Sequence, residues 1–119
     1  MSKIDDAIRG HLEIERLLLQ LAEEAAELGK AALKLERVID GTNPTPIGIE
    51  EASEKVIEEA ADVYCVLGLI LSAEDHLQIH KIIEKKKERW LQRLEEKENE
   101  AEGEIQGKTE GNASASASI

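Results

Sequence analysis

The segment VYCVLGLIL, residues 63–71, is apolar on every face and constrains the fold of this chain more than any other feature. Its nine residues are too few to cross a bilayer, because a membrane-spanning helix needs about 20. A helix that is apolar all round is buried all round. We therefore expect this segment to lie inside an assembly of helices.

The composition favours an all-α fold. Hydrophobic residues make up 41% of the chain but aromatic residues only 2%, and there are two prolines. The apolar content is Leu, Ile, Val and Ala beside many Glu and Lys, which is typical of helical proteins. The length of 119 residues suits a single domain.

Apolar periodicity and breaker residues predict four helices, at about residues 4–9, 12–39, 50–71 and 73–97. Gly10 marks a break after the first, and DGTNPTPIG, residues 40–48, reads as a loop. Ser72 and Asp75 form a capping box before the fourth helix. The last residues lose the apolar pattern, so we expect a helical domain over 1–98 and a disordered acidic Ser-Ala tail over 99–119.

Three helices of a chain this size cannot easily surround a fourth. We therefore expect a four-helix-bundle type of fold that is completed by dimerisation, with a homotetramer as a further possibility. The alternative is a compact monomer with the third helix at its centre. In the second helix the expected core stripe has steps of three and four residues. It consists of Ile14, Leu17, Leu18, Leu21, Ala25, Leu28, Ala32, Leu35 and Ile39.

The formal net charge of −11 argues against binding to nucleic acid or to an anionic membrane by charge alone. Cys65 is the single cysteine, which excludes an intramolecular disulfide and fits a reducing compartment. The N-terminal residues do not resemble a signal peptide. We expect a soluble, cytoplasmic protein.

Acidic residues precede the apolar segment. At about 100° per residue, Glu59 and Asp62 lie about 60° apart on the third helix, and Val66 and Leu69 continue their face. These two acids thus share a face with residues expected to be buried. Glu58 points about 100° away from Glu59 and is expected to face solvent.

The second helix carries a matching pair. Glu24 and Glu27 have the same spacing, with Glu24 at the rim of the expected core and Glu27 one step further out. If the two helices pack antiparallel, all four carboxylates can converge. Four carboxylates at a dry site repel one another unless a cation joins them. An all-oxygen anionic cluster suits Mg²⁺, with Mn²⁺ as an alternative.

The residues QLAEEAAELGKA, 20–31, and IEEAADVYCVL, 57–67, resemble the MazG-like all-α nucleoside-triphosphate pyrophosphohydrolases. The resemblance lies in Glu-Glu-x-x-Glu on one helix and Glu-x-x-Asp on the next. It implies an oligomeric, Mg²⁺-dependent helical bundle. It also implies hydrolysis of a nucleoside triphosphate, often a deoxynucleotide, to the monophosphate and pyrophosphate.

Carried over by position, the resemblance makes four acids the metal ligands: Glu24, Glu27, Glu59 and Asp62. Basic residues on the following helix would contact phosphate, with Lys86 and Arg89 as the first candidates and Lys85 or Arg93 as replacements. Gln20 is a further candidate for substrate binding. Glu23 is a candidate for the carboxylate that accepts a proton from the attacking water.

Two functions are compatible with these features. The first is a pyrophosphohydrolase that acts on a (d)NTP in nucleotide-pool housekeeping. The alternative is a non-enzymatic helical dimerisation or adaptor module whose acidic faces are merely solvated. A dependence on Mg²⁺ would separate the two.

Overall fold

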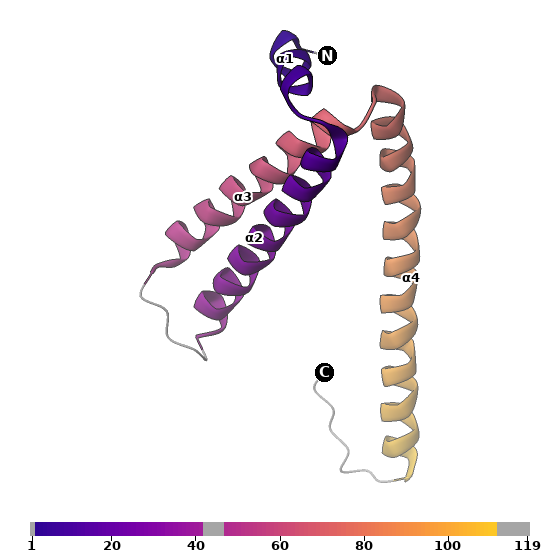
Figure 1. Cartoon of the computed structure of the whole chain (residues 1–119). Helices are drawn as coiled ribbons and strands as arrows, with labels where there is room; N and C mark the ends of the chain where they lie inside the picture. The colour runs from indigo at the N-terminus through magenta and orange to yellow at the C-terminus, as the bar shows by residue number, and fades with distance from the viewer. Residues whose placement is uncertain (1, 42–46, 112–119) are drawn as a thin grey trace. The chain divides into compact units, whose positions relative to one another are not determined.

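The computed structural model describes residues 2–41 and 47–111, with side chains as far as residue 103. These residues form the helices α1 (Lys3–His11), α2 (Ile14–Asp40), α3 (Ile49–Ile70) and α4 (Ala73–Gly111) (Figure 1). The described ranges contain no strand, so the predicted all-α class is confirmed. The chain divides into two compact units, residues 1–73 and residues 74–119.

The first helix begins at a serine cap. The Oγ of Ser2 accepts a hydrogen bond of 3.1 Å from the backbone N–H of Asp5, as expected of an N-cap. The predicted break lies slightly further along the chain, because α1 continues through Gly10 to His11 and α2 begins at Ile14. One glycine costs a helix only about 1 kcal/mol, which the capped first turn and the packing of α1 on α3 can offset.

The second helix ends where the sequence indicates a loop. Gly41 adopts a left-handed conformation with φ of 72°, and its N–H donates to the carbonyl of Arg37 at 2.9 Å. This is a common glycine termination of a helix, since a side chain at such a φ is strained. The remainder of the predicted loop, residues 42–46, lies outside the described residues.

Helices α2 and α3 lie side by side and run in opposite directions, forming a hairpin (Figure 1). The buried and half-buried residues of α2 follow one another in strictly alternating steps of four and three. They are Leu17, Leu21, Glu24, Leu28, Ala31, Leu35 and Val38. On α3 the same alternation runs through Ala52, Val56, Glu59, Val63, Val66 and Ile70. This is the heptad pattern of a coiled-coil seam.

The core stripe predicted for α2 is therefore partly wrong. Leu18 and Ile39 are 50% and 64% exposed, and Ile14, Ala25 and Ala32 are exposed as well. The sequence contains two parallel apolar rows on α2, and the single neighbouring helix covers only one of them. The uncovered row leaves large apolar side chains at the surface of this unit.

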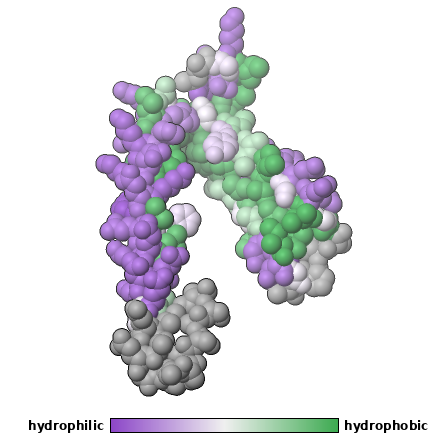
Figure 2. All heavy atoms as spheres, turned by 180° about the vertical axis from the view of Figure 1, so that it is seen from behind, coloured by the Kyte–Doolittle hydropathy of each residue, from purple (hydrophilic) through white to green (hydrophobic). Residues whose placement is uncertain are grey.

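Helix α3 also has an uncovered apolar side. Val66 and Leu69 are buried, as predicted, whereas Ile57, Tyr64 and Cys65 are exposed. Hydrophobic surface is gathered over the hairpin, as the green area in Figure 2 shows. We call the exposed apolar residues on the two helices the outer apolar surface of the hairpin. Its large members are Ile14, Leu18, Leu19, Leu33 and Ile39 on α2 and Ile49, Ile57 and Tyr64 on α3.

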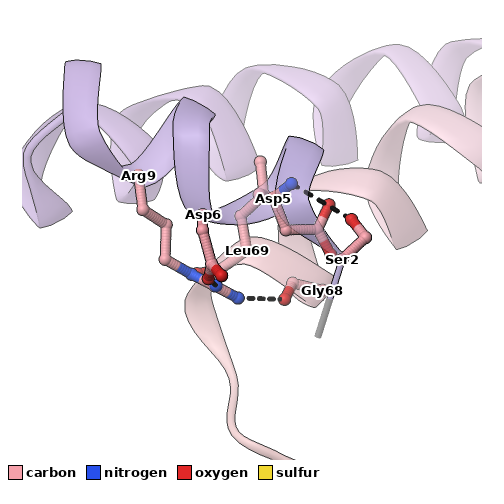
Figure 3. Close-up of polar contacts among 6 residues, drawn as sticks. All are labelled: Ser2, Asp5, Asp6, Arg9, Gly68 and Leu69. Carbon is pink, nitrogen blue, oxygen red and sulfur yellow. Dashed lines mark hydrogen bonds and ion pairs between the residues drawn. The ribbon is translucent and has the colours of Figure 1, made fainter.

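Arg9 ties α1 to the C-terminal end of α3. Its guanidinium donates hydrogen bonds to the backbone carbonyls of Leu69, at 2.8 Å, and Gly68, at 2.9 Å (Figure 3). Asp6 accepts a third bond from the same group at 3.2 Å. The last carbonyls of a helix have no partner within it and carry partial negative charge, so a cation there is doubly favourable.

Replacing Arg9 by glutamine should lower the free energy of unfolding by about 1 to 2 kcal/mol, because charge-assisted bonds to α3 carbonyls are lost. Urea denaturation followed by circular dichroism measures this change. The exposed Arg16 on α2 supplies the control, since Arg16→Gln removes the same charge. Equal effects of the two variants would show that net charge, and not the end of α3, explains the loss.

Helix α4 belongs mainly to the second unit. It continues to Gly111, so its predicted end near residue 97 is wrong. Residues 99–111, predicted to be disordered, are helical, and residues 112–119 lie outside the described residues. The segment contains four glutamates, which favour a helix without any apolar stripe, but also three glycines, which disfavour it. Lys86 and Arg89 are exposed on this helix.

Among the described residues, no helix is both long enough and apolar enough to cross a membrane.

A candidate metal centre in the α2–α3 hairpin

Three carboxylates converge between α2 and α3. Glu24, Glu59 and Asp62 each place one oxygen within 4.8 Å of the oxygens of the other two. Glu59 is only 7% exposed, Glu24 is half-buried and Asp62 is exposed. The cluster is therefore supported from the interior of the hairpin and open to solvent on the side of Asp62.

The position of the cluster follows from the seam. Glu24 takes the place between Leu21 and Leu28 in the apolar row of α2. Glu59 takes the equivalent place in the row of α3, four residues before Val63. An apolar residue at either position would pack better, because a buried carboxylate without a partner is costly. From the sequence, Glu24 was expected at the rim of the core, whereas it lies in the seam itself.

A lysine accompanies the buried acid. The Nζ of Lys55 lies 3.0 Å from Oε1 of Glu59 and 3.5 Å from Oε2 of Glu58. The hydrogen bond to Glu59 and the negative charges of Glu58 and Glu59 raise the pKa of Lys55 above its usual 10.5. Lys55 is thus a cation at any physiological pH, and Glu59 has one charged partner within its own helix.

Gln20 supports the second acid of the seam. Its Nε2 donates a hydrogen bond of 2.6 Å to Oε1 of Glu24, one helical turn further along α2. The side chain was expected to bind substrate. In the hairpin it restricts the rotation of the Glu24 carboxylate, as residues behind metal ligands commonly do.

The other predicted acids lie outside the cluster. Glu27 is not among the three converging carboxylates; its Oε1 lies 3.6 Å from Nζ of Lys30, and about half of its side chain is exposed. Glu23 is exposed on α2. Glu58 is exposed, as predicted. The structure thus brings together Glu24, Glu59 and Asp62 and leaves Glu27 in solvent.

The three acids suit a hard divalent cation. Their donors are all carboxylate oxygens, the ligand type that Mg²⁺ and Mn²⁺ prefer. Mg²⁺ holds oxygen ligands at about 2.1 Å, so ligands on opposite sides are about 4.2 Å apart. Oxygens within 4.8 Å of one another can reach these positions by small side-chain rotations. Three protein ligands would leave coordination positions for water or phosphate oxygens.

Two lysines lie along the same hairpin. Lys34 of α2 and Lys55 of α3 line a shallow cleft together with Ile47, Glu51, Glu54 and Glu58. Lys55 was not predicted as a site residue, although its spacing of four residues from Glu59 is a recognisable signal of an ion pair. Lys86 and Arg89, the predicted phosphate contacts, are on α4.

Comparison of this chain with protein-family models, with curated proteins and with solved structures finds no match. The resemblance to the MazG-like pyrophosphohydrolases therefore stays a prediction.

Proposed function

We propose that this protein is a Mg²⁺-dependent pyrophosphohydrolase that cleaves a nucleoside or deoxynucleoside triphosphate to the monophosphate and pyrophosphate. The observation that carries the proposal is the pair of acids in the seam. Glu24 and Glu59 occupy core positions of two helices, with Asp62 beside them at the surface. Such an arrangement weakens the packing of the hairpin, and a bound cation would offset that loss.

A polyphosphate substrate fits the charge of this unit. Residues 1–73 contain fifteen acidic and seven basic residues, so a bare anion would be repelled. A metal-bound triphosphate presents cations to the carboxylates instead. The exposure of Asp62 opens the cluster on the side from which such a substrate would approach.

Under this proposal, different residues would bind the metal, orient its ligands and accept the proton of the attacking water. Glu24, Glu59 and Asp62 would hold Mg²⁺, with Gln20 fixing the orientation of Glu24. Bound Mg²⁺ supplies Lewis-acid polarisation of phosphate and a more acidic water. The exposed Glu23 could accept the proton of that water.

Lys86 and Arg89 remain our candidates for donors that stabilise charge on the departing pyrophosphate. Both carry their charge at the solvent-facing surface of α4. Glu27 could join as a fourth ligand only after a change of side-chain rotamer, because its carboxylate pairs with Lys30.

We further propose that the protein is a homodimer or homotetramer. The outer apolar surface of the hairpin supports this, because monomers rarely expose many large apolar side chains side by side. Two hairpins packed through these surfaces would form a four-helix bundle. A single, exposed Cys65 is compatible with the cytoplasm, where thiols stay reduced.

The second candidate function is a non-enzymatic dimerisation or adaptor module. The ion pair of Lys55 with Glu59 favours it, since this pair already gives the buried acid a partner without any metal. Under this alternative the outer apolar surface would be the functional feature and the acids would be solvated. The two functions make opposite predictions about divalent cations.

We expect 5 mM Mg²⁺ or Mn²⁺ to raise the melting temperature relative to EDTA by several degrees, about the effect of a cation present at 100 times its Kd (~2.7 kcal/mol). Pyrophosphate release from a panel of common and modified NTPs and dNTPs then tests catalysis. A matched rise in NaCl controls for ionic strength. A panel without pyrophosphate release under Mg²⁺ and Mn²⁺ would contradict the enzymatic function.

A further inference from the structure

We propose that Lys55 is a built-in counter-cation of the carboxylate cluster, which holds Glu59 while no metal is bound and leaves it when a divalent cation binds. The proposal rests on the proposed metal site and adds a competitor to it. Lys55 would thereby set the concentration of cation at which the site fills.

The geometry places Lys55 on a carboxylate that a metal would need. Its Nζ is 3.0 Å from Oε1 of Glu59, the most buried acid of the cluster. Apart from Lys55 itself, the ion pairs of the described residues give Glu59 no other cationic partner. In the metal-free protein this ammonium therefore stabilises a carboxylate that would otherwise be buried without a counter-charge.

A second carboxylate lies within reach of the Lys55 ammonium. Half of the lysine side chain is exposed, and Oε2 of the exposed Glu58 lies 3.5 Å from the same Nζ. A small rotation of the flexible lysine stem would exchange Glu59 for Glu58 without leaving the ammonium unpaired. Release from Glu59 thus costs little, which suits a competitor that a cation can displace.

An ammonium and a divalent cation on one carboxylate repel each other. If Lys55 stayed in place, the two cations would be only a few ångströms apart, where their repulsion exceeds the attraction of an exposed ion pair. Under the proposal, binding of the metal therefore includes the departure of Lys55 from Glu59. The favourable free energy of metal binding is then reduced by the free energy needed to break the Lys55–Glu59 pair.

The test is Mn²⁺ binding to the full chain, measured by isothermal titration calorimetry or electron paramagnetic resonance. Lys55→Met keeps the length of the stem but removes the charge, and should lower the Kd for Mn²⁺ about 3- to 10-fold. Lys3→Met is the matched control, because Lys3 is exposed on α1 outside the cluster and its replacement also removes one positive charge. An equal gain in both variants, no gain, or weaker binding by Lys55→Met would overturn the proposal.

A second measurement needs no metal. In EDTA, Lys55→Met should lower the melting temperature, whereas the same change made on top of Glu59→Gln should have little effect, because the pair is already broken. Additive effects would show that Lys55 does not hold Glu59, while Mn²⁺ binding by the natural chain would leave the metal site intact. If the effects of Lys55→Met and Glu59→Gln are non-additive but the natural chain binds no Mn²⁺, both the displacement of Lys55 by a metal and the proposed function are refuted.

Discussion

Replacing Glu59 by glutamine is expected to reduce pyrophosphate release at least about 100-fold, while the protein remains helical and folded. Glutamine has the same shape but lacks the negative charge that the most buried ligand of the cluster would give to Mg²⁺. The measurement is initial velocity at saturating Mg²⁺ with the best substrate of the panel. Circular dichroism on the same preparation verifies the fold.

Glu50→Gln is the matched control for this result. Glu50 also lies on α3, carries the same charge and is exposed outside the cluster. Its replacement should change the rate less than about threefold. A similar loss in both variants would mean that the charge of α3, rather than the cluster, determines activity, and the site assignment would then be wrong.

The stability of Glu59→Gln decides whether a loss of activity can be separated from a loss of folding. Removing one of three carboxylates within 4.8 Å of one another relieves repulsion, although it also removes the partner of Lys55. The variant should therefore unfold in EDTA at a temperature close to that of the natural chain. It should also lose the stabilisation by Mg²⁺, so that activity and metal response disappear together without loss of the fold.

The second large effect concerns assembly. Leu33→Glu should weaken self-association at least about 100-fold, because an unpaired charge buried in an interface costs several kcal/mol. Leu33 is 60% exposed in the single chain, so the same change should hardly affect the fold of one copy. Sedimentation equilibrium over a range of protein concentrations measures the association constant.

Lys30→Glu provides the comparison on the same helix. It makes α2 more negative than Leu33→Glu does, but it alters an exposed position that is paired with Glu27 and not apolar. The dimer should survive it. If the natural chain sediments as a monomer at every concentration, the proposed oligomer is wrong; if Leu33→Glu still dimerises, the interface lies on another surface.

The sequence predicts the bounds of α2 and α3 well because their signals are local, although it does not predict the end of α4. The loop between α2 and α3 begins at Gly41 as the glycine and proline pattern indicates, and α3 begins and ends within a residue of its predicted bounds. The choice of buried row on α2 is different. Leu17 and Leu18 head two rows of similar hydrophobicity, and only the position of α3 decides that Leu17 is covered and Leu18 is not.

The candidate site was predictable for a similar reason. Glu59 and Asp62 share a face by helical geometry alone, and antiparallel packing then brings Glu24 to them. Whether Glu27 reaches the cluster depends on the rotation of α2 about its own axis. The predicted core stripe of α2 combined two apolar rows, so this rotation and the position of Glu27 outside the cluster were not predicted. The role of Gln20 beside Glu24 depends on a side-chain rotamer, which periodicity does not encode.

The two seam acids also bear on how the hairpin finds its alignment. The other residues of the seam are Leu, Val, Ile and Ala, and one apolar heptad can pack on the next almost as well as on its own partner. A slip of seven residues would separate Glu24 from Glu59 and set each acid among aliphatic side chains, at a cost of several kcal/mol. Glu24 and Glu59 thus destabilise the native seam, but they destabilise every misaligned seam more. The native register is therefore the most stable alignment of the two helices.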